Sequence, residues 1–319
     1  MNILIIQTAF IGDAILATSV LEKLHQFFPT AQIDLLVRKG NESLFVEHPF
    51  LNEVLVWDKK QNKLKNLLGL INKVRSKKYD KVINLHRFAS SGIITAFSAA
   101  TEKIGFDKNP LSLLFTKKIK HVIGDGRHEV ERNQELIADF TDTKFNKPRL
   151  YPTANDYKKV EEYKTQPYVC MAPSSVWFTK QLPEQKWVEL IKKTDSNTKI
   201  YLLGAANDTE KCDLIIKKSE AKNCVNLCGK LNLLQSAALI QNAEMNYVND
   251  SAPLHLASAT NANVTAFFCS TVPAFGFGPL SDKSIIKQTT ENLDCRPCGL
   301  HGFKECPKGH FKCGNTIEI

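Results

Sequence analysis

The chain has 319 residues, of which 43% are hydrophobic and 24% are charged, and its formal net charge at pH 7 is +9. This composition is typical of a folded globular protein and excludes an intrinsically disordered chain, and the length allows two domains of ordinary size. The positive charge favours an anionic partner, such as nucleic acid, a phosphorylated glycolipid or an anionic membrane surface, without choosing among them.

The amino terminus, Met1 to Gln7, has no basic segment and too short an apolar run for a signal peptide. No stretch approaches the roughly 20 apolar residues that span a bilayer. We therefore expect a cytoplasmic protein. In that reducing compartment, the cysteines scattered through regular elements are expected to be buried thiols. They are Cys170, Cys212, Cys224, Cys228 and Cys269.

Strands and helices are predicted to alternate in the first half of the chain. The expected strands are residues 2–7, 33–37, 54–57, 81–85 and a strand near Ile104. The expected helices are residues 13–28, 63–79, 90–100 and 128–140. Residues 141–167 interrupt this order with prolines and mixed charge, and they are the best candidate for a linker.

Alternation resumes after the linker candidate. The expected strands are residues 168–172 and 199–203, the run ending at Val248, and residues 264–268. The expected helices are residues 184–194, 208–219, 232–242 and one beginning near Asp250. Such alternation predicts an α/β fold with parallel sheets, and its restart predicts two Rossmann-like domains, residues 1–155 and 156–319. Ligands would then bind in the cleft between the strand ends of the two domains.

One predicted strand-to-helix junction is rich in polar side chains. The strand ending at Val248 leads into residues 249–251, which are Asn, Asp and Ser, and then into Pro253 and His255. Asn, Asp and Ser cap helices, and proline is tolerated in the first helical turn. The free N–H groups of a helix start form an anion site. An ordinary capped helix explains the same residues.

The first predicted strand leads into Gly12 and Asp13. Glycine permits a tight passage of the backbone into the following helix. Asp13 is a candidate general base, which would accept a proton from a substrate hydroxyl. A plain N-cap aspartate is the alternative interpretation. No G-x-G-x-x-G motif is present, so a nicotinamide cofactor is not supported.

Two segments of the second half carry groups that suit a nucleotide. Ser174 and Ser175 precede Lys180 in a strand-to-helix segment, and hydroxyls together with a lysine suit a phosphate. The glycines of a P-loop are absent, and a solvated loop lysine is the alternative. Asp208 follows the next strand, where a carboxylate either binds ribose hydroxyls or caps the next helix.

The region from residue 59 to residue 81 contains nine lysines or arginines and one acid. Its leucines and isoleucine form an apolar side. A basic amphipathic helix that touches anionic lipid is one interpretation, and a core-facing helix with a solvated basic face is the other. Candidates for an acceptor side are His86, Arg87, Arg127, His128 and Arg132.

The last cysteines, Cys295, Cys298, Cys306 and Cys313, begin with a C-x-x-C pair. This pattern is compatible with a structural zinc site, although its last two gaps are wider than those of a zinc ribbon. Reduced thiols that pack a loop, or an adventitious disulfide, are the alternatives. A structural role is expected in each case.

Several short motifs occur in a family-specific order. They are Ile11-Gly12-Asp13, Ala172-Pro173-Ser174 with Trp177 and Lys180, Cys228-Gly229-Lys230, Asn249-Asp250-Ser251 with His255, Phe275 to Ser281, and the cysteine tail. Together they resemble the ADP-heptose:lipopolysaccharide heptosyltransferases, glycosyltransferase family 9, from residue 1 to about residue 313. The heptosyltransferase II branch is the most similar.

The resemblance implies a GT-B fold, with two Rossmann-like domains whose parallel sheets face each other across a cleft. Residues 1–155 would bind the acceptor and residues 156–319 the nucleotide-sugar donor. It further implies an inverting, metal-independent transfer of heptose from ADP-heptose to the inner core of lipopolysaccharide, with no required cofactor. The expected partners are ADP-heptose and a lipid A–core acceptor, with peripheral contact at the cytoplasmic face of the inner membrane and no nucleic acid.

The same resemblance assigns roles to individual residues. Asp13 would deprotonate the acceptor hydroxyl. The departing pyrophosphate would be held by Lys180, Ser174, Ser175 and the N–H groups around Ser251. Asp208 would bind the ribose or the donor sugar, and Asp250 and His255 would complete the donor pocket. Two positions depart from the family pattern: Ala252 stands where glycine is usual, and Leu182 stands where tryptophan is frequent.

Two other functions remain open from the sequence. One is a different nucleotide-sugar enzyme of the same architecture, with another donor or with epimerase or hydrolase activity. The other is a zinc-containing nucleic-acid-binding protein, which the net charge and the tail cysteines suggest. Against it, the lysines are spread widely and no nucleic-acid module is recognisable. Salt-dependent binding to DNA or RNA without nucleotide-sugar binding would favour it.

Overall fold

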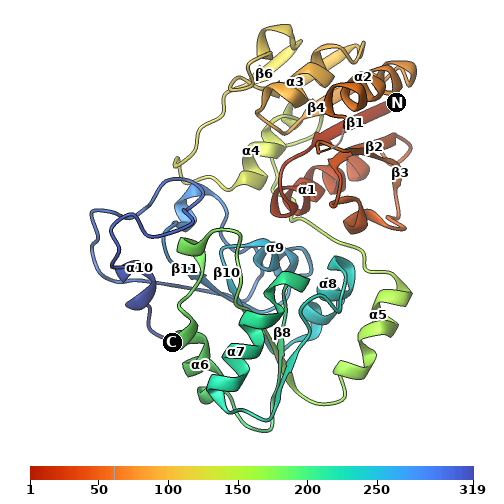
Figure 1. The fold of residues 1–319 in the computed structure, drawn as a ribbon. Coiled ribbons are helices and arrows are strands. Elements are labelled where there is room, and N and C mark those ends of the chain that lie inside the picture. The colour runs from red at the N-terminus through yellow and green to blue at the C-terminus, as the bar shows by residue number, and fades with distance from the viewer. Residues whose placement is uncertain (61) are drawn as a thin grey trace. The chain divides into compact units, whose positions relative to one another are not determined.

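The computed structural model describes residues 1–60 and 62–319 (Figure 1). The chain divides into two compact units, Met1–Tyr151 (unit 1) and Pro152–Ile319 (unit 2). The division falls between Tyr151 and Pro152, whereas the sequence prediction placed it after residue 155. Each unit contains a parallel six-stranded sheet with helices, so the predicted α/β class is confirmed.

Unit 1 has the strand order β3-β2-β1-β4-β5-β6. Its strands are β1 (Asn2–Gln7), β2 (Gln32–Arg38), β3 (Leu51–Trp57), β4 (Lys81–Asn84), β5 (Glu102–Phe106) and β6 (Lys117–Ile119). Its α-helices are α1 (Ile11–Phe27), α2 (Lys63–Ser76), α3 (Ala89–Ala96) and α4 (Glu129–Glu135). Its 3₁₀-helices are η1 (Glu42–Phe45), η2 (Ser112–Leu114) and η3 (Ala138–Phe140).

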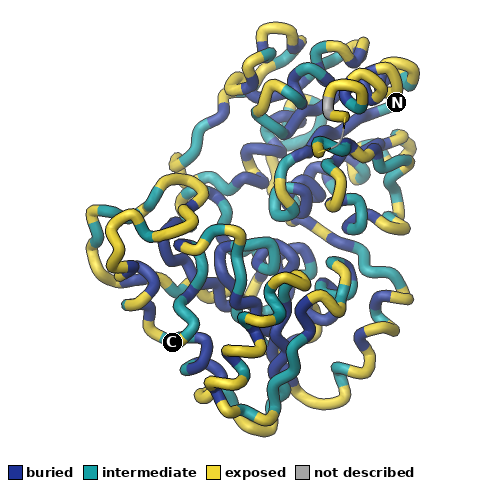
Figure 2. The backbone as a smooth tube through the Cα atoms, in the orientation of Figure 1, coloured by how far each residue is buried: buried dark blue, intermediate teal, exposed yellow. Residues whose placement is uncertain are grey.

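The centre of the unit 1 sheet determines where its polar loops gather. β1 pairs with β2 on one side and with β4 on the other, so the strand order reverses at β1. Ile3 to Ile6 are fully buried, as expected for a central parallel strand covered on both faces (Figure 2). The loops after β1 and β4 therefore leave the same edge of the sheet at a switch point, where open α/β sheets bind ligands.

Unit 2 repeats this arrangement with the strand order β12-β11-β10-β7-β8-β9. Its strands are β7 (Tyr168–Ala172), β8 (Lys199–Leu202), β9 (Cys224–Asn226), β10 (Met245–Asn249), β11 (Val264–Phe268) and β12 (Ser284–Gln288). Its α-helices are α5 (Ala154–Val160), α6 (Glu184–Lys193), α7 (Thr209–Ser219), α8 (Leu233–Asn242), α9 (Ala252–Ala259) and α10 (Lys312–Asn315). Its 3₁₀-helices are η4 (Glu161–Tyr163), η5 (Phe178–Lys180), η6 (Ala206–Asp208) and η7 (Pro273–Phe275). The reversal occurs at β7, between β10 and β8.

The structure adds three strands that the sequence did not predict, β6, β9 and β12. They are short or exposed and lie at sheet edges, where hydrophobic periodicity is weak. The linker prediction is wrong for the part of 141–167 that forms α5 and η4. A capping box begins α5: Thr153 N–H donates to Asp156 Oδ2 (2.9 Å) and Asp156 N–H donates to Thr153 Oγ1 (3.2 Å).

Helix α2 carries the basic stretch. Its apolar side chains Leu67, Leu70, Ile71 and Val74 are buried in the unit 1 core. Two other leucines, Leu64 and Leu68, are 75% and 63% exposed. The core-facing interpretation therefore holds for one face of the helix. Within the described residues, none of the helices has the length and apolar character needed to cross a membrane.

Candidate active site

Asp13 is the third residue of α1 and is half-buried. Phe10 occupies the N-cap position, so Asp13 is not the plain N-cap residue of the alternative interpretation. Burial, followed by the negative charge of Glu129, raises the pKa of Asp13 to about 6. Backbone hydrogen bonds and the charge of Arg87 oppose this rise. A carboxylate with such a pKa has the proton affinity that a general base needs near neutral pH.

His86 and Arg87 lie in the loop after β4, on the same sheet edge as the loop that leads to Asp13. The Thr8 hydroxyl lies 3.0 Å from His86 Nδ1, which joins the two loops. Burial lowers the pKa of His86 to about 3, and the charges of Lys59 and Arg87 lower it further. The imidazole is therefore neutral at physiological pH. A neutral ring can both donate and accept a hydrogen bond, and the neighbouring Arg87 is a cation.

A buried amide that the sequence analysis missed holds this loop. Asn109 Nδ2 donates to the carbonyls of His86 and Phe88, each at 3.1 Å. Gly92 makes this approach possible, because a Cβ there would lie 2.1 Å from Asn109 Oδ1. Asn109 follows β5 in a turn that has no periodic pattern. Its role in holding the His86 loop is therefore visible only in the folded structure.

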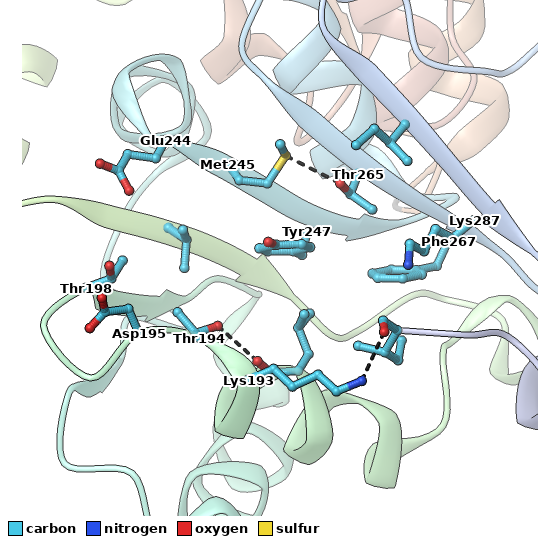
Figure 3. Close-up of a pocket in the computed structure, with 14 residues that line it drawn as sticks. Lys193, Thr194, Asp195, Thr198, Glu244, Met245, Tyr247, Thr265, Phe267 and Lys287 are labelled. Atoms are coloured by element: carbon cyan, nitrogen blue, oxygen red, sulfur yellow. Dashed lines mark hydrogen bonds between the residues drawn. The ribbon is translucent and has the colours of Figure 1, made fainter.

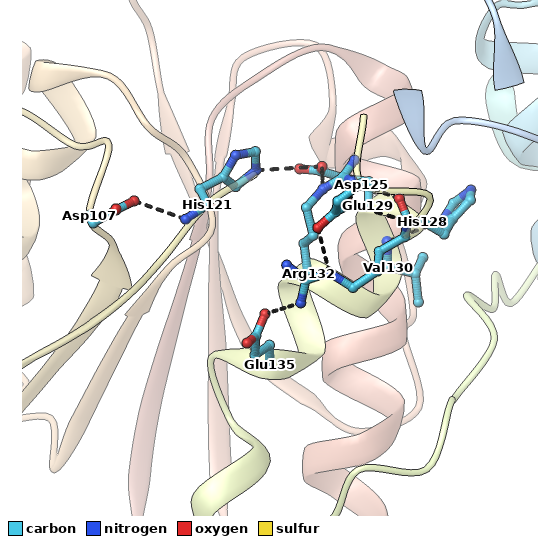
Figure 4. A network of polar contacts seen from close by, with 9 residues as sticks. Asp107, His121, Asp125, His128, Glu129, Val130, Arg132 and Glu135 are labelled. Atoms are coloured by element: carbon cyan, nitrogen blue, oxygen red, sulfur yellow. Dashed lines mark hydrogen bonds and ion pairs between the residues drawn. The ribbon is translucent and has the colours of Figure 1, made fainter. Parts of the chain in front are cut away.

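Arg127 does not present a free guanidinium. It pairs with Asp125 at 2.7 Å and with Glu135 at 2.6 Å. Its expected role in binding the acceptor stays a prediction, since these two pairs engage only Nε and one terminal nitrogen of the guanidinium. The neighbouring Arg132 is fully buried and contacts Glu129 and Asp125 (Figure 4). These residues form an ionic network around the start of α4.

In unit 2, Lys180 and Asp250 come together. Lys180 Nζ lies 2.7 Å from Asp250 Oδ2, and the Thr271 hydroxyl donates to the same oxygen at 2.6 Å. Lys180 ends η5 after β7, and Asp250 follows β10. The two predicted donor residues therefore meet at the switch point of the second sheet, as an ion pair.

Asn249, which the sequence analysis treated only as a capping residue, fastens the loop that carries Lys180. Its Oδ1 accepts from Leu182 N–H at 2.9 Å, and its Nδ2 donates to the Pro173 carbonyl at 2.9 Å. Asn249 is fully buried. The amide thus fixes both ends of the segment between β7 and α6.

The remaining predicted donor residues lie on the same edge of this sheet. The buried Ser174 hydroxyl has no hydrogen-bond partner among the described residues, which leaves it available to a ligand. Ser175 accepts a hydrogen bond at its carbonyl from Gln181 at 2.6 Å. Asp208 Oδ2 accepts from Ala205 N–H at 2.8 Å, at the start of η6. Asp208 occupies the N-cap position of α7 but makes no side-chain capping hydrogen bond to that helix, and its ribose role stays a prediction.

The start of α9 is as the sequence predicted, with one difference. Ser251 occupies the N-cap position and Pro253 lies in the first turn, but the Ser251 side chain makes no capping hydrogen bond. Its hydroxyl donates to the Asn249 carbonyl at 3.4 Å. Ala252 is the first helical residue, and His255 is buried on the same helix. The N–H groups of the first turn are therefore not covered by the Ser251 hydroxyl.

Lys211 is a further basic residue that the sequence analysis missed. It extends from α7 to the Pro173 carbonyl at 3.3 Å and also contacts Gln181 Oε1. Burial lowers the pKa of Lys211. The lysine side chain thus contacts both sides of the Ser174–Ser175 loop, at Pro173 and at Gln181. Its helix has an ordinary amphipathic pattern, so the sequence did not indicate this role.

The cysteine tail supports the site through an arginine. Arg296 donates to the carbonyls of Cys269 (2.7 Å), Phe268 (3.1 Å) and Thr271 (2.8 Å), which form the loop after β11. Thr271 in turn contacts Asp250. The tail therefore has the structural role that was expected.

The zinc interpretation of the tail receives no support. Across residues 1–60 and 62–319, the structure brings no three His, Cys, Asp or Glu side chains together in a way that could hold a metal ion. The tail thiols instead pack or form hydrogen bonds: Cys313 is buried in the core, and Cys298 Sγ lies 3.0 Å from the Cys295 carbonyl. None of the four tail cysteines, all of which lie within the described residues, forms a disulfide.

A cavity of about 490 Å³ lies elsewhere in unit 2 (Figure 3). It is lined by side chains from the first half of several strands, including Met245 and Thr265, and by Lys193 and the carboxy-terminal Ile319. The predicted donor residues follow the opposite, carboxyl ends of the strands. Since nucleotides bind at the carboxyl ends of parallel strands, we do not assign the donor to this cavity.

Two doubly wound parallel sheets, each with polar groups gathered at its switch point, form the GT-B fold. The chain belongs to glycosyltransferase family 9 (heptosyltransferase), whose family model matches residues 67–301. It is therefore a glycosyltransferase, as the motifs predicted.

Individual relatives are distant. The chain is 28% identical to lipopolysaccharide heptosyltransferase 3 of Escherichia coli K12 over 279 residues, 83% of this chain and 81% of that protein. The structure of E. coli ADP-heptose lps heptosyltransferase II matches with a TM-score of 0.78 at 22% identity and covers 93% of this chain and 96% of that one. E. coli heptosyltransferase WaaC with ADP matches with a TM-score of 0.75 at 21% identity, over 90% and 92%.

Proposed function

We propose that this protein transfers heptose from ADP-heptose to a heptose on the inner core of lipopolysaccharide, in the manner of a heptosyltransferase II. The observation that carries the proposal is the family match over residues 67–301. Two of the relatives named above are lipopolysaccharide heptosyltransferases by name, and the solved WaaC structure holds ADP. The polar groups at the two switch points supply the chemistry that such a transfer needs.

In the proposed reaction, unit 1 binds the acceptor and supplies the base. Asp13 accepts the proton of an acceptor hydroxyl, whose oxygen attacks the anomeric carbon of heptose. A new glycosidic C–O bond forms while the bond from the anomeric carbon to the ADP oxygen breaks, and ADP leaves with the electron pair. Attack from the face opposite ADP inverts the anomeric configuration. His86 and Arg87 are proposed to orient the acceptor.

Unit 2 is proposed to hold the donor without requiring a metal. Lys180, the Ser174 hydroxyl and the N–H groups at the start of α9 would stabilise the negative charge that develops on ADP. Lys180 pairs with Asp250 at 2.7 Å, so the diphosphate would either share the lysine with Asp250 or replace it. Asp208 is proposed to hold the ribose and His255 to border the donor sugar.

The acceptor is a lipid, so we also propose peripheral contact with the cytoplasmic face of the inner membrane. Leu64 and Leu68 are exposed on α2 next to Lys65 and other basic residues, which suits an anionic interface. Vesicle flotation with anionic and neutral lipid tests this idea. Loss of binding in a Leu64→Ser/Leu68→Ser variant, but not in Leu113→Ser, supports it. Equal binding by all three proteins contradicts it.

The activity is tested by incubating the purified protein with ADP-heptose and lipopolysaccharide that ends in a single core heptose. ADP release that depends on the acceptor, together with a mass increase of one heptose, is the expected result. ADP-glucose and UDP-sugars serve as competing donors. Release of ADP without the acceptor, or conversion of the sugar, would instead support the hydrolase or epimerase alternative.

A further inference from the structure

The start of helix α4 lies against the helix that carries Asp13. α1 and α4 pack on each other, and Gln134 Nε2 lies 3.5 Å from the Ser19 carbonyl. With a rise of about 1.5 Å per residue, Glu129 lies roughly 7.5 Å and Asp13 roughly 9 Å along their helices from this contact. The ring of Phe28, at the end of α1, lies 6.2 Å from the ring of Phe140, which follows α4, so the two helices run in the same direction. Both carboxylates therefore belong to the first turn of their helix, toward the same end of the pair.

Glu129 is held in a buried ionic cluster (Figure 4). Arg132 Nε lies 2.9 Å from Glu129 Oε2, and His121 Nε2 lies 3.7 Å from the same oxygen. Glu129 is 5% exposed, His121 3% and Arg132 0%. Asp125 Oδ1 lies 3.6 Å from Arg132, and Asp107 accepts from the backbone N–H of His121 at 2.9 Å. The carboxylate thus has little freedom to move.

Such a cluster needs an explanation other than stability. Desolvation of buried ions offsets much of their attraction, and replacing a buried ion pair with apolar residues is often neutral or stabilising. Arg132 also donates to the Arg127 carbonyl at 2.7 Å, so the guanidinium is well satisfied. The cluster fixes the negative charge of Glu129 at the start of α4, the helix that packs against the helix carrying Asp13.

We propose that Glu129, held by Arg132, is a positioning residue for Asp13, and that its fixed negative charge strengthens the proton affinity of the base. This inference rests on the proposed function, in which Asp13 accepts the acceptor proton. The order of the effects on the pKa of Asp13 agrees with this inference. After burial, the charge of Glu129 is the next largest cause of the raised pKa of Asp13, and the opposing charge of Arg87 is smaller.

Glu129 itself stays ionised in this arrangement. Burial tends to raise the pKa of Glu129, but its contact with His121 and the charge of Arg132 outweigh burial, so the pKa is lowered. One carboxylate is therefore kept charged so that its neighbour binds a proton more tightly. Environments that push two pKa values apart are typical of acid–base sites.

The test is the pH profile of kcat/KM for Glu129→Gln, because glutamine retains an acceptor oxygen for Arg132 but carries no charge. The acid limb is expected to move to lower pH by about half a unit to one unit. Glu129→Asp, which keeps the charge, is expected to restore most of the profile. Asp139→Asn removes an exposed carboxylate that pairs with Lys117 in the same unit, and it should leave the limb unchanged.

A titration by NMR keeps the proposal testable if Glu129→Gln has no activity. The protein is labelled with ¹³C at its aspartate carboxyls. The Asp13 signal is then assigned as the one that is missing from the spectrum of the Asp13→Asn variant. Its midpoint should fall in Glu129→Gln and stay constant in Asp139→Asn. An unmoved midpoint overturns the positioning role. Full activity of Asp13→Asn would instead overturn the base assignment, so the two failures are distinguishable.

Discussion

Asp13 and Asp250 both lie at switch points of the two Rossmann-like units, Asp13 after β1 and Asp250 after β10, but their surroundings are opposite. Each follows a central parallel strand at a switch point. Burial, followed by the negative charge of Glu129, raises the pKa of Asp13 to about 6. Asp250 faces a lysine, with Lys180 Nζ 2.7 Å away, and accepts a hydrogen bond from Thr271.

The two surroundings suit a carboxylate to two different tasks. A neighbouring negative charge favours the protonated form and makes a carboxylate a better base, whereas a neighbouring lysine is an ion-pair partner for it. Asp13 is therefore suited to proton transfer, and Asp250 is suited to orienting a cation that meets the donor. The following predictions test this division of roles.

The largest effect is expected for Asp13→Asn. An amide cannot accept the acceptor proton, so kcat should fall by about 10³-fold, within the usual range for general-base removal. ADP binding, measured by calorimetry, should be unchanged because the proposed donor residues all lie in unit 2. A variant that lost both turnover and ADP binding would show that Asp13 is not confined to proton transfer.

The same substitution is expected to raise stability at neutral pH. Because the pKa of Asp13 is raised from 3.8 to about 6 in the folded state, the folded protein binds the proton more tightly than the unfolded chain does. The stability of the wild type therefore falls as pH rises from about 4 to 6, and it stays low above that window. Asn remains neutral, so urea unfolding should give Asp13→Asn an advantage of about 2 kcal/mol at pH 8.

That advantage should shrink as pH is lowered toward 5, where the wild-type carboxyl becomes protonated. Asp139→Asn is the matched control, since this side chain is exposed and pairs with Lys117. An equal gain in both variants would mean that the effect arises from net charge alone. No gain at pH 8 would mean that Asp13 is not desolvated.

Lys180→Ala is expected to weaken ADP binding by about 10-fold and to lower kcat as well, because the lysine would stabilise charge on the leaving group. It also leaves Asp250 buried without its cation, which adds a repulsion toward the diphosphate. The control is Lys218→Ala, which removes an exposed lysine paired with Glu184. Unchanged ADP affinity in Lys180→Ala would remove this residue from the donor site.

The fold was predictable because its signals are local. Central strands such as β1 and β7 are continuous apolar runs, and α9 begins with recognisable capping residues. The short edge strands β6 and β9 lack such a pattern, and α5 was hidden in a segment with several prolines, although Thr153 and Asp156 have the spacing of a capping box.

The candidate site was predictable where one residue carries the chemistry, as with Asp13 and Lys180. It was not predictable where a residue acts by holding a loop. Asn109 and Asn249 are buried amides whose partners are distant in the chain, with Asn249 and Leu182 67 positions apart. Glu129 lies in a predicted helix whose sequence draws attention only to the basic residues Arg127, His128 and Arg132. Such roles depend on tertiary packing, which no short motif records.

The smallest effect is expected for Arg296→Lys, which tests how the tail supports Asp250. Lysine keeps the charge but loses the planar group that binds several carbonyls at once, including those of Cys269 and Thr271. The loop after β11 should then hold Thr271, and through it Asp250, less firmly. ADP affinity should fall by about three-fold, or roughly 0.7 kcal/mol, with little change in the KM for the acceptor. A larger change in the acceptor KM than in ADP affinity would contradict a role of the tail in holding the donor. It would also weaken the division between a unit 1 that accepts the proton and a unit 2 that holds the donor.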